Sequence, residues 1–285
     1  MRKSLALVLA LLMAVSLVPG ALAGTSDVAD ASQMTTVDAV GEEGMIPVRA
    51  ESLLDGEYPV TVECSSSMFR IESAVLTVKD GSMSAVLTMG GKSYLYLFPG
   101  TAQEAAAAAE DAFIPFAENA EGAHTFTVPA EALDAPFSCA AYSKNKELWY
   151  DRTLLFRADS LPVSAFKDGF FTTAETLGLA DGRYMVEVQL AGGSGKAKVQ
   201  SPAALYVEGG ECTAVIGWSS KNYDYMKVEG EKYLPVPNED NAAFRIPVLF
   251  FDRPMPVIAD TVAMSEPHEI QYTLRFDSAS LEAAP

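Results

Sequence analysis

Histidine, cysteine and basic residues are all scarce in this sequence. Its 285 residues include two histidines, His124 and His268, and three cysteines. Two histidines are too few for a histidine-rich zinc or copper site. Cys64, Cys139 and Cys212 are too few and too scattered for a disulfide-rich scaffold or a zinc ribbon. They can form one disulfide at most, so at least one thiol stays unpaired within the chain.

Basic residues are outnumbered by acidic ones. Lys and Arg number 20 against 38 Asp and Glu, which gives a net charge of −18. Loss of Arg2 and Lys3 with an N-terminal signal leaves 18 basic side chains, and 18 minus 38 is −20. Such a field repels phosphate backbones and anionic lipid headgroups. We therefore expect neither nucleic acid nor a membrane surface as a direct partner, and the acidic surface favours solubility outside the cell.

One long apolar run opens the chain, "MRKSLALVLALLMAVSLVPGALA". Two basic residues precede the run and a small-residue Ala-Leu-Ala sequence ends it, which is typical of a cleavable secretory signal peptide. A proline-glycine pair interrupts the run, which argues against a membrane anchor. We expect residues 1–23 to be removed and the mature protein to be secreted or held at the extracellular face of the cell envelope.

The remaining chain contains one module twice. The segment "DGEYPVTVEC" at 55–64 recurs as "DGRYMVEVQL" at 181–190, and "TFTVPAEALDAPF" at 125–137 recurs as "AFRIPVLFFDRPM" at 243–255. The segment "RTLLFRADSL" at 152–161 recurs as "YTLRFDSASL" at 272–281. The order of the segments is preserved, so a unit of about 100 residues is used twice and each copy must bury its own core.

Short stretches of alternating apolar and polar residues make up both copies. In "ALYVEGGECTAVIGW" a Gly-Gly pair separates two β-rich runs, as a hairpin turn does, and Asp80-Gly81 takes that place in the first copy. The pattern predicts an all-β protein of two tandem antiparallel β-sandwich modules. The expected divisions are a flexible acidic lead-in at 24–50, a first module at 51–158, a linker at 159–180 and a second module at 181–281.

The first copy carries an additional segment, "TAQEAAAAAEDAF". Thr101 and Glu104 form a capping-box pattern, and the alanines that follow favour a helix. The segment predicts a short helical insert in the first module. It is either a connecting loop that is helical or a lid or docking element.

The strand order of the second copy resembles that of the NEAT domain, a near-iron-transporter module of Gram-positive cell envelopes. The residues that carry the resemblance are "DGRY", "PAALYVEGGECTAVIGW", "SSKNYDYMKVEGEKYLPV", "AFRIPV", "DRPMPVIA" and "HEIQYTLRFD". They span 181–277, and the first copy matches less sharply over 55–156. The resemblance implies an immunoglobulin-like fold and a non-enzymatic, haem-binding or haem-relaying function in iron acquisition. It also implies haem-carrying proteins and an envelope ABC transporter binding protein as partners.

The resemblance also implies a ligand pair on the closing strand, where the family presents Tyr-x-x-x-Tyr. The first tyrosine ligates haem iron, and the second hydrogen-bonds to the first tyrosine. His268 and Tyr272 hold these positions here, and imidazole is a competent haem ligand. Alternation predicts one strand face with His268, Ile270, Tyr272, Leu274 and Phe276. The alternative is that this face is core and His268 a polar strand-end residue.

Further pocket candidates lie in "SSKNYDYMKV" at 219–228. An extended strand places Tyr223 and Tyr225 on one face and Met226 on the other. Two tyrosine rings can stack on a flat ligand, with Met226 as a soft contact, although packing in the core or on the sheet explains them equally. The first copy keeps the tyrosine spacing as Tyr94 and Tyr96.

The two copies depart from the family at the lip that covers the other face of the porphyrin. The second copy has "AGGSGKAKVQS" there, whereas the first has "SSSMFRIES", in which Met68 and Phe69 form a small apolar lip. The first copy has Leu148 and Arg152 where the second has its ligand pair. An alternative function is therefore a cell-surface protein-interaction module of the adhesion type that has lost haem binding.

Overall fold

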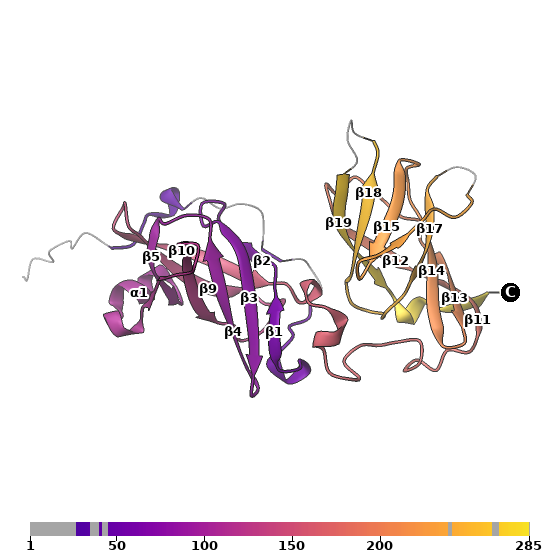
Figure 1. The fold of residues 1–285 in the computed structure, drawn as a ribbon, viewed down its shortest axis with the longest axis horizontal. Coiled ribbons are helices and arrows are strands. Elements are labelled where there is room, and N and C mark those ends of the chain that lie inside the picture. Colours follow the sequence, from indigo (N-terminus) through magenta and orange to yellow (C-terminus); the bar gives the residue numbers. More distant parts are fainter. Residues whose placement is uncertain (1–26, 35–39, 42–44, 239–240, 264–267, 285) are drawn as a thin grey trace, which may run out of the picture.

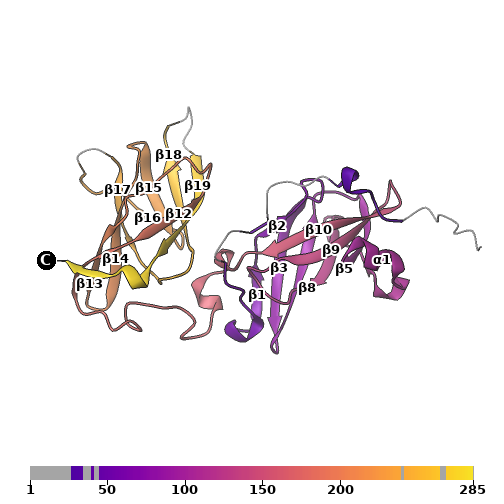
Figure 2. The same cartoon turned by 180° about the vertical axis from the view of Figure 1, so that it is seen from behind.

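The computed structural model describes residues 27–34, 40–41, 45–238, 241–263 and 268–284. The predicted signal peptide lies outside these residues. Figure 1 shows two β-rich bodies side by side along the long axis, the first in indigo to magenta and the second in orange to yellow, and Figure 2 shows them from behind. The predicted fold class is confirmed, because the described chain is built from four antiparallel sheets.

The first module contains two five-stranded sheets, in the orders β1-β3-β4-β8-β7 and β2-β10-β9-β5-β6. The strands are β1 (Gly56–Pro59), β2 (Val62–Cys64), β3 (Ile71–Lys79), β4 (Ser82–Met89), β5 (Tyr94–Pro99), β6 (Ile114–Pro115), β7 (Ala117–Glu118), β8 (His124–Pro129), β9 (Phe137–Ser143) and β10 (Leu148–Phe156).

The second module repeats this plan with the orders β17-β14-β13-β11-β20 and β12-β19-β18-β15-β16. The strands are β11 (Gly182–Val186), β12 (Val188–Gly192), β13 (Ala203–Glu208), β14 (Glu211–Gly217), β15 (Tyr223–Val228), β16 (Glu231–Tyr233), β17 (Ala243–Pro247), β18 (Met255–Thr261), β19 (His268–Phe276) and β20 (Glu282–Ala284). Strands β1, β3, β4 and β8 thus correspond to β11, β13, β14 and β17, and β2, β10, β9 and β5 correspond to β12, β19, β18 and β15.

The internal repeat extends to single hydrogen bonds. The Tyr58 hydroxyl donates to the carbonyl of Leu54 at 3.0 Å, and the Tyr184 hydroxyl donates to the carbonyl of Ala180 at 2.8 Å. The predicted hairpin turns also match, since both central residues have positive φ in each: 50° and 76° at Asp80-Gly81, and 61° and 88° at Gly209-Gly210. Such angles fit a two-residue turn between twisted strands.

A second repeated contact closes each module near its end. Asp134 and Asp252 both have positive φ, 54° and 65°. The backbone N–H of Ala158 donates to Asp134 Oδ1 at 2.8 Å, and that of Ser278 donates to Asp252 Oδ1 at 2.8 Å. An aspartate tolerates the left-handed backbone and caps the chain after the closing strand.

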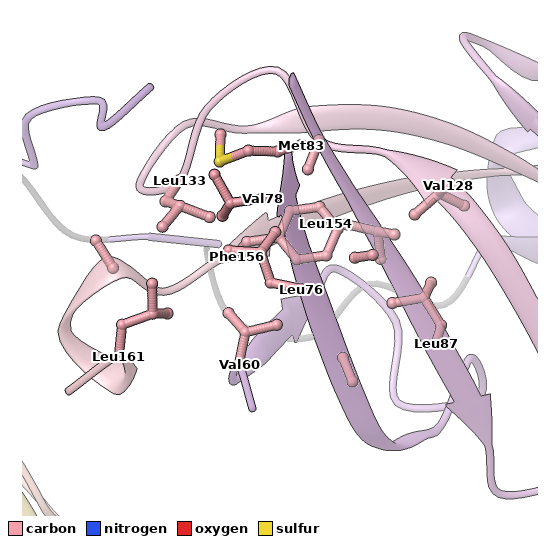
Figure 3. Close-up of a cluster of buried hydrophobic side chains, with 14 of the residues drawn as sticks. Val60, Leu76, Val78, Met83, Leu87, Val128, Leu133, Leu154, Phe156 and Leu161 are labelled. Atoms are coloured by element: carbon pink, nitrogen blue, oxygen red, sulfur yellow. The ribbon is translucent and has the colours of Figure 1, made fainter. Parts of the chain in front are cut away.

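Each module buries its own apolar core between its two sheets. Figure 3 shows part of the first core, where side chains from the two sheets and from the segment after β10 meet. The labelled residues are Val60, Leu76, Val78, Met83, Leu87, Val128, Leu133, Leu154, Phe156 and Leu161. The second core is a separate cluster that includes Leu205, Ile216, Phe244 and Leu274, each fully buried.

The predicted helical insert is present as α1 (Ala102–Ala107), capped by Thr101 and Glu104 in a capping box. Its buried Ala102 and Ala105 pack with Ala140 and Trp149 on the outside of the β10-β9-β5 sheet. Figure 1 shows α1 at the end of the first module that is remote from the second. The insert therefore covers one sheet face and does not reach the second module.

The described parts of the lead-in and of the linker pair with the modules. Val28 forms a parallel bridge with Trp149, and Val48 an antiparallel bridge with Leu133. Phe166 lies in the first core, and Phe171 packs against both cores. The 3₁₀ turns are Ala31–Gln33, Ala50–Ser52, Glu110–Ala112, Ala158–Ser160, Val163–Ala165 and Ser278–Ser280. In the part of the chain that the structure describes, none of the helical segments has the length and apolar character needed to cross a bilayer.

Asp134 makes stability depend on pH. Burial raises the pKa of this carboxyl to about 6, aided by nearby Asp159 and opposed by the Ala158 N–H. Because the folded chain holds this proton more tightly than the unfolded chain, the charged form lowers stability above pH 6, and the penalty disappears as the pH falls toward 4. We expect Asp134→Asn, which keeps the acceptor and tolerates positive φ, to be more stable than wild type at pH 8 and equal to it near pH 4.

Urea denaturation at a series of pH values measures this difference. Asp134→Ala is the control, since it removes both the charge and the acceptor and should be less stable than Asp134→Asn at every pH. If the difference in unfolding free energy between wild type and Asp134→Asn is the same at pH 4 and pH 8, the raised pKa of Asp134 is contradicted.

Candidate functional site

The closing strand β19 carries the predicted ligand pair on its inner face. Burial alternates along Ile270–Phe276, with Tyr272, Leu274 and Phe276 buried and the residues between them more exposed, as the sequence predicts. His268 begins the strand opposite Thr261 of β18, and its side chain is exposed. Tyr272 lies further inside with 4% of its surface exposed. The pair therefore shares a face, but the histidine lies at the open end of the sandwich and the tyrosine in its core.

The hydroxyl of Tyr272 has a partner inside the module. It lies 3.1 Å from the hydroxyl of Tyr223 on β15. The ring of Trp218 contacts both tyrosines, with centroid distances of 4.1 Å to Tyr223 and 5.1 Å to Tyr272. Burial and the hydrogen bond with Tyr272 both raise the pKa of Tyr223. We call Trp218, Tyr223 and Tyr272 the aromatic cluster.

Met226 belongs to the same interior. It is fully buried, and its sulfur accepts a hydrogen bond from Trp218 Nε1 at 3.3 Å. The thioether thus packs beneath the aromatic cluster, where it stabilises the core.

The segment after β12 closes the aromatic cluster from the side where the family carries its lip. A Cβ atom added at Gly193 would lie 2.6 Å from Tyr272 Cε1 and 3.0 Å from its hydroxyl oxygen. Gly193 also has a φ of +59°. Absence of a side chain at this position therefore lets the backbone lie directly on the Tyr272 ring. Gly193 thus closes the aromatic cluster on this side.

The expectation that Tyr223 and Tyr225 share a strand face is wrong. Their pairing with β18 shifts register between the two residues, which is a β-bulge. A bulge adds one residue to a strand and reverses the alternation that follows. Tyr223 therefore faces the core together with Met226, while Tyr225 faces outward.

Tyr225 belongs to a polar cluster on the outer face of the same sheet. Its hydroxyl donates to Glu269 Oε1 at 2.7 Å, and Lys227 Nζ donates to the same oxygen at 2.5 Å. The ammonium of Lys232 lies 3.5 Å from the centroid of the Tyr225 ring. The hydrogen bond to Glu269 raises the pKa of Tyr225 to about 12. Glu269 and Lys232 thus fix the Tyr225 side chain on the sheet face opposite to His268 and Tyr272.

The five candidate residues consequently do not line one haem pocket. Tyr272 and Met226 are buried, the Tyr223 hydroxyl is bonded to Tyr272, and Tyr225 lies on the other sheet face. Of these five, His268 is the residue with an exposed side chain on the inner-face row. A metal site of another kind is not indicated either, because no group of three His, Cys, Asp or Glu residues within the described ranges could hold an ion.

The same position in the first module holds a different pair. Arg152 takes the place of Tyr272, is buried, and donates through Nη2 to the hydroxyl of Tyr94 at 3.2 Å. The segment that the sequence proposes as a lip forms a turn, in which the backbone N–H of Phe69 donates to the carbonyl of Ser66 and the Phe69 ring is buried in the core, 5.1 Å from Tyr94. The internal repeat aligns Arg152 with Tyr272. It does not predict that Arg152 is buried, because arginine side chains are mostly exposed.

The cysteines do not form a disulfide. Cys64 on β2 pairs with Leu154 of β10, and Cys139 on β9 pairs with Arg152 of β10. Because β10 lies between the two cysteine strands, their Cα atoms are about 10 Å apart, beyond the reach of a disulfide. Cys212 belongs to the second core, so all three thiols are free.

A cleft of about 860 Å³ lies between the two modules. Its walls include Glu63, Arg157 and Asp134 from the first module and Lys227 and Gln271 from the second. Arg157 forms ion pairs with Glu63 and Asp159 at 2.8 and 2.5 Å. The sequence of one module cannot predict this cleft, because both modules and the linker form it.

The linker joins the modules through aromatic contacts at one end of the cleft. Phe171 stacks on Phe250 with centroids 4.2 Å apart, and the guanidinium of Arg253 lies 4.3 Å from the centroid of Phe170.

No protein-family model matches the chain, and no match to a curated protein was found.

Gly193 tests whether the aromatic cluster is closed as described. We expect Gly193→Ala to lower the free energy of unfolding of the second module by about 2 kcal/mol more than Gly195→Ala. Both glycines have positive φ, +59° and +71°, but an added Cβ meets nothing within 4 Å at Gly195. The difference therefore isolates the contact with Tyr272. Urea denaturation followed by tryptophan fluorescence measures it, and equal losses in the two variants would exclude the contact.

Proposed function

We propose that the protein is an exported, non-enzymatic binding protein of the bacterial cell envelope that assists iron acquisition by handling haem or a related iron ligand. Three features support the proposal. The chain begins with a secretory signal pattern, its strand order resembles that of NEAT domains, and its closing strand carries His268 at an exposed end. Haem-carrying proteins and an envelope ABC transporter binding protein are the partners that we propose with it.

The exposed position of His268 is the observation that carries this proposal. The imidazole lies on the inner-face row of β19, at the open end of the sandwich and beyond the aromatic cluster. A neutral imidazole nitrogen can ligate haem iron at such a rim. Tyr272 then has the role of a core residue that fixes β19 against β15, through its contact with Tyr223. A single ligand at an open rim favours weak, exchangeable binding, which suits transfer between proteins.

Haemin titration of the mature chain tests the proposal. We expect a saturable Soret band at micromolar haemin that His268→Ala abolishes, because it removes the iron ligand. Tyr272→Phe should keep the band, because the buried hydroxyl does not reach the iron. Gln271→Ala is the matched control, since Gln271 is exposed on the same strand but on the opposite face. A wild-type chain without a Soret band, or a band that survives His268→Ala, would refute the assignment of the ligand.

A second candidate function is a protein-interaction module of the adhesion type. The closed aromatic cluster favours it, because Gly193 lies on Tyr272 where a haem-binding member would carry a lip and an open pocket. On this alternative the modules keep the sandwich as a scaffold and bind a protein partner. Absence of haemin binding by a chain that is folded by circular dichroism would favour it.

A further inference from the structure

Arg152 is a buried cation in the interior of the first module. It lies on the inner face of β10, between Tyr150 and Leu154 on the same row, and 5% of its surface is exposed. Arginine remains protonated in proteins, so it cannot escape burial by losing its charge. An isolated charge in a protein interior is costly unless a counter-charge or several hydrogen bonds stabilise it.

The protein groups that contact Arg152 supply no counter-charge. Its Nη1 donates to the backbone carbonyl of Asp151 at 2.6 Å, and its Nη2 donates to the Tyr94 hydroxyl. Its Nε is buried and has no hydrogen-bond partner among the described residues. Within that same part of the chain, no carboxylate lies within ion-pair distance of the guanidinium. Burial raises the pKa of Cys139 to about 12 and also raises that of Cys64, so neither neighbouring thiol provides a thiolate at neutral pH.

A second buried polar group, Ser66, lies next to Cys64, the thiol on which the Arg152 charge acts. The Ser66 side chain is 2% exposed, and its Oγ has no hydrogen-bond partner among the described residues. Pairing between β2 and β10 continues past Cys64, because the backbone N–H of Ser65 donates to the carbonyl of Thr153 at 2.9 Å. Strand β2 ends at Cys64, and the chain bends at Ser65. The backbone N–H of Ser66 donates to the Cys64 sulfur, and the charge of Arg152 acts on the same thiol. Two buried side chains that each have a polar atom without a partner in the described part of the chain therefore lie around Cys64.

We propose that the first module binds a small oxyanion, such as phosphate or sulfate, at Arg152 and Ser66 beneath the turn Ser66–Phe69. The guanidinium donates to the anion through Nε, and Ser66 donates its hydroxyl proton. Tyr94 accepts from Nη2, which leaves its own hydroxyl proton free to donate to the same anion. The net charge of −18 disfavours polyanions, so a small ion matches the site better than a nucleic acid or a membrane.

The turn above Arg152 provides the way in. One backbone hydrogen bond of 3.1 Å, from Phe69 to Ser66, closes the turn, and the Phe69 ring contacts the ring of Tyr94, whose hydroxyl accepts from Arg152. Met68 at the tip is 69% exposed. Movement of this four-residue turn would admit an ion without unfolding either sheet.

Thermal unfolding of the mature chain in phosphate, sulfate or acetate, against chloride at equal ionic strength, tests the proposal. A ligand that binds the folded state raises the midpoint with its concentration. We expect wild type to be stabilised by at least one oxyanion, and Arg152→Met to keep only the general salting effect of that anion. Arg245→Met is the matched control, since it removes an exposed arginine and should respond as wild type does. Comparison of the three oxyanions distinguishes a tetrahedral ion from a carboxylate.

Isothermal titration with the stabilising anion gives an independent measurement in case Arg152→Met does not fold. Ser66→Ala should weaken binding about tenfold, because it removes one hydrogen bond to a charged group. Binding that is equal in wild type, Ser66→Ala and Arg152→Met would show an adventitious surface ion and overturn the proposal. So would the absence of any oxyanion-specific stabilisation of wild type.

Discussion

A polar side chain on the inner face of a β-sandwich must find its partner inside the sandwich, because water does not reach it. In each module this constraint acts on one position of the closing strand, which is Tyr272 in the second module and Arg152 in the first. Both residues contact a tyrosine two strands away in the same sheet, Tyr223 or Tyr94. The two modules thus share one architecture and differ in the side chain at this position, which is a tyrosine in the second module and a charged arginine in the first.

This difference separates the two modules chemically. The hydroxyls of Tyr272 and Tyr223 are hydrogen-bonded to each other, and Gly193 and Trp218 close around them. Little is left for a ligand there except the rim at His268. Arg152 contacts Tyr94, a backbone carbonyl and the ring of Tyr150, none of which carries a negative charge. The repeated fold thus has one module whose polar side chains at this position pair with each other, and one whose buried arginine has no charged partner among the described residues.

The sequence predicts the features that depend on local pattern. Alternation along residues 268–276, the glycine-containing hairpin turns and the capping box of α1 all follow from neighbouring residues, and the internal repeat predicts that the modules match. The bulge between Tyr223 and Tyr225 does not follow, because a simple period of two assumes an uninterrupted strand. Burial of Arg152 and the closure by Gly193 depend on residues far apart in the chain. The interdomain cleft depends on how Phe171 and Phe250 stack, which no pattern within one module records.

Accessibility of Tyr272 is the quantity on which the proposed division of roles depends. Nitration of the folded chain with tetranitromethane, followed by peptide mass spectrometry, measures it directly at each tyrosine. Tyr96 is 37% exposed and Tyr272 is 4% exposed. We expect Tyr96 to be modified while Tyr272 stays unmodified until the chain is unfolded. Nitration of Tyr272 at a rate similar to that of Tyr96 would contradict a closed aromatic cluster and would return Tyr272 to the set of iron ligands.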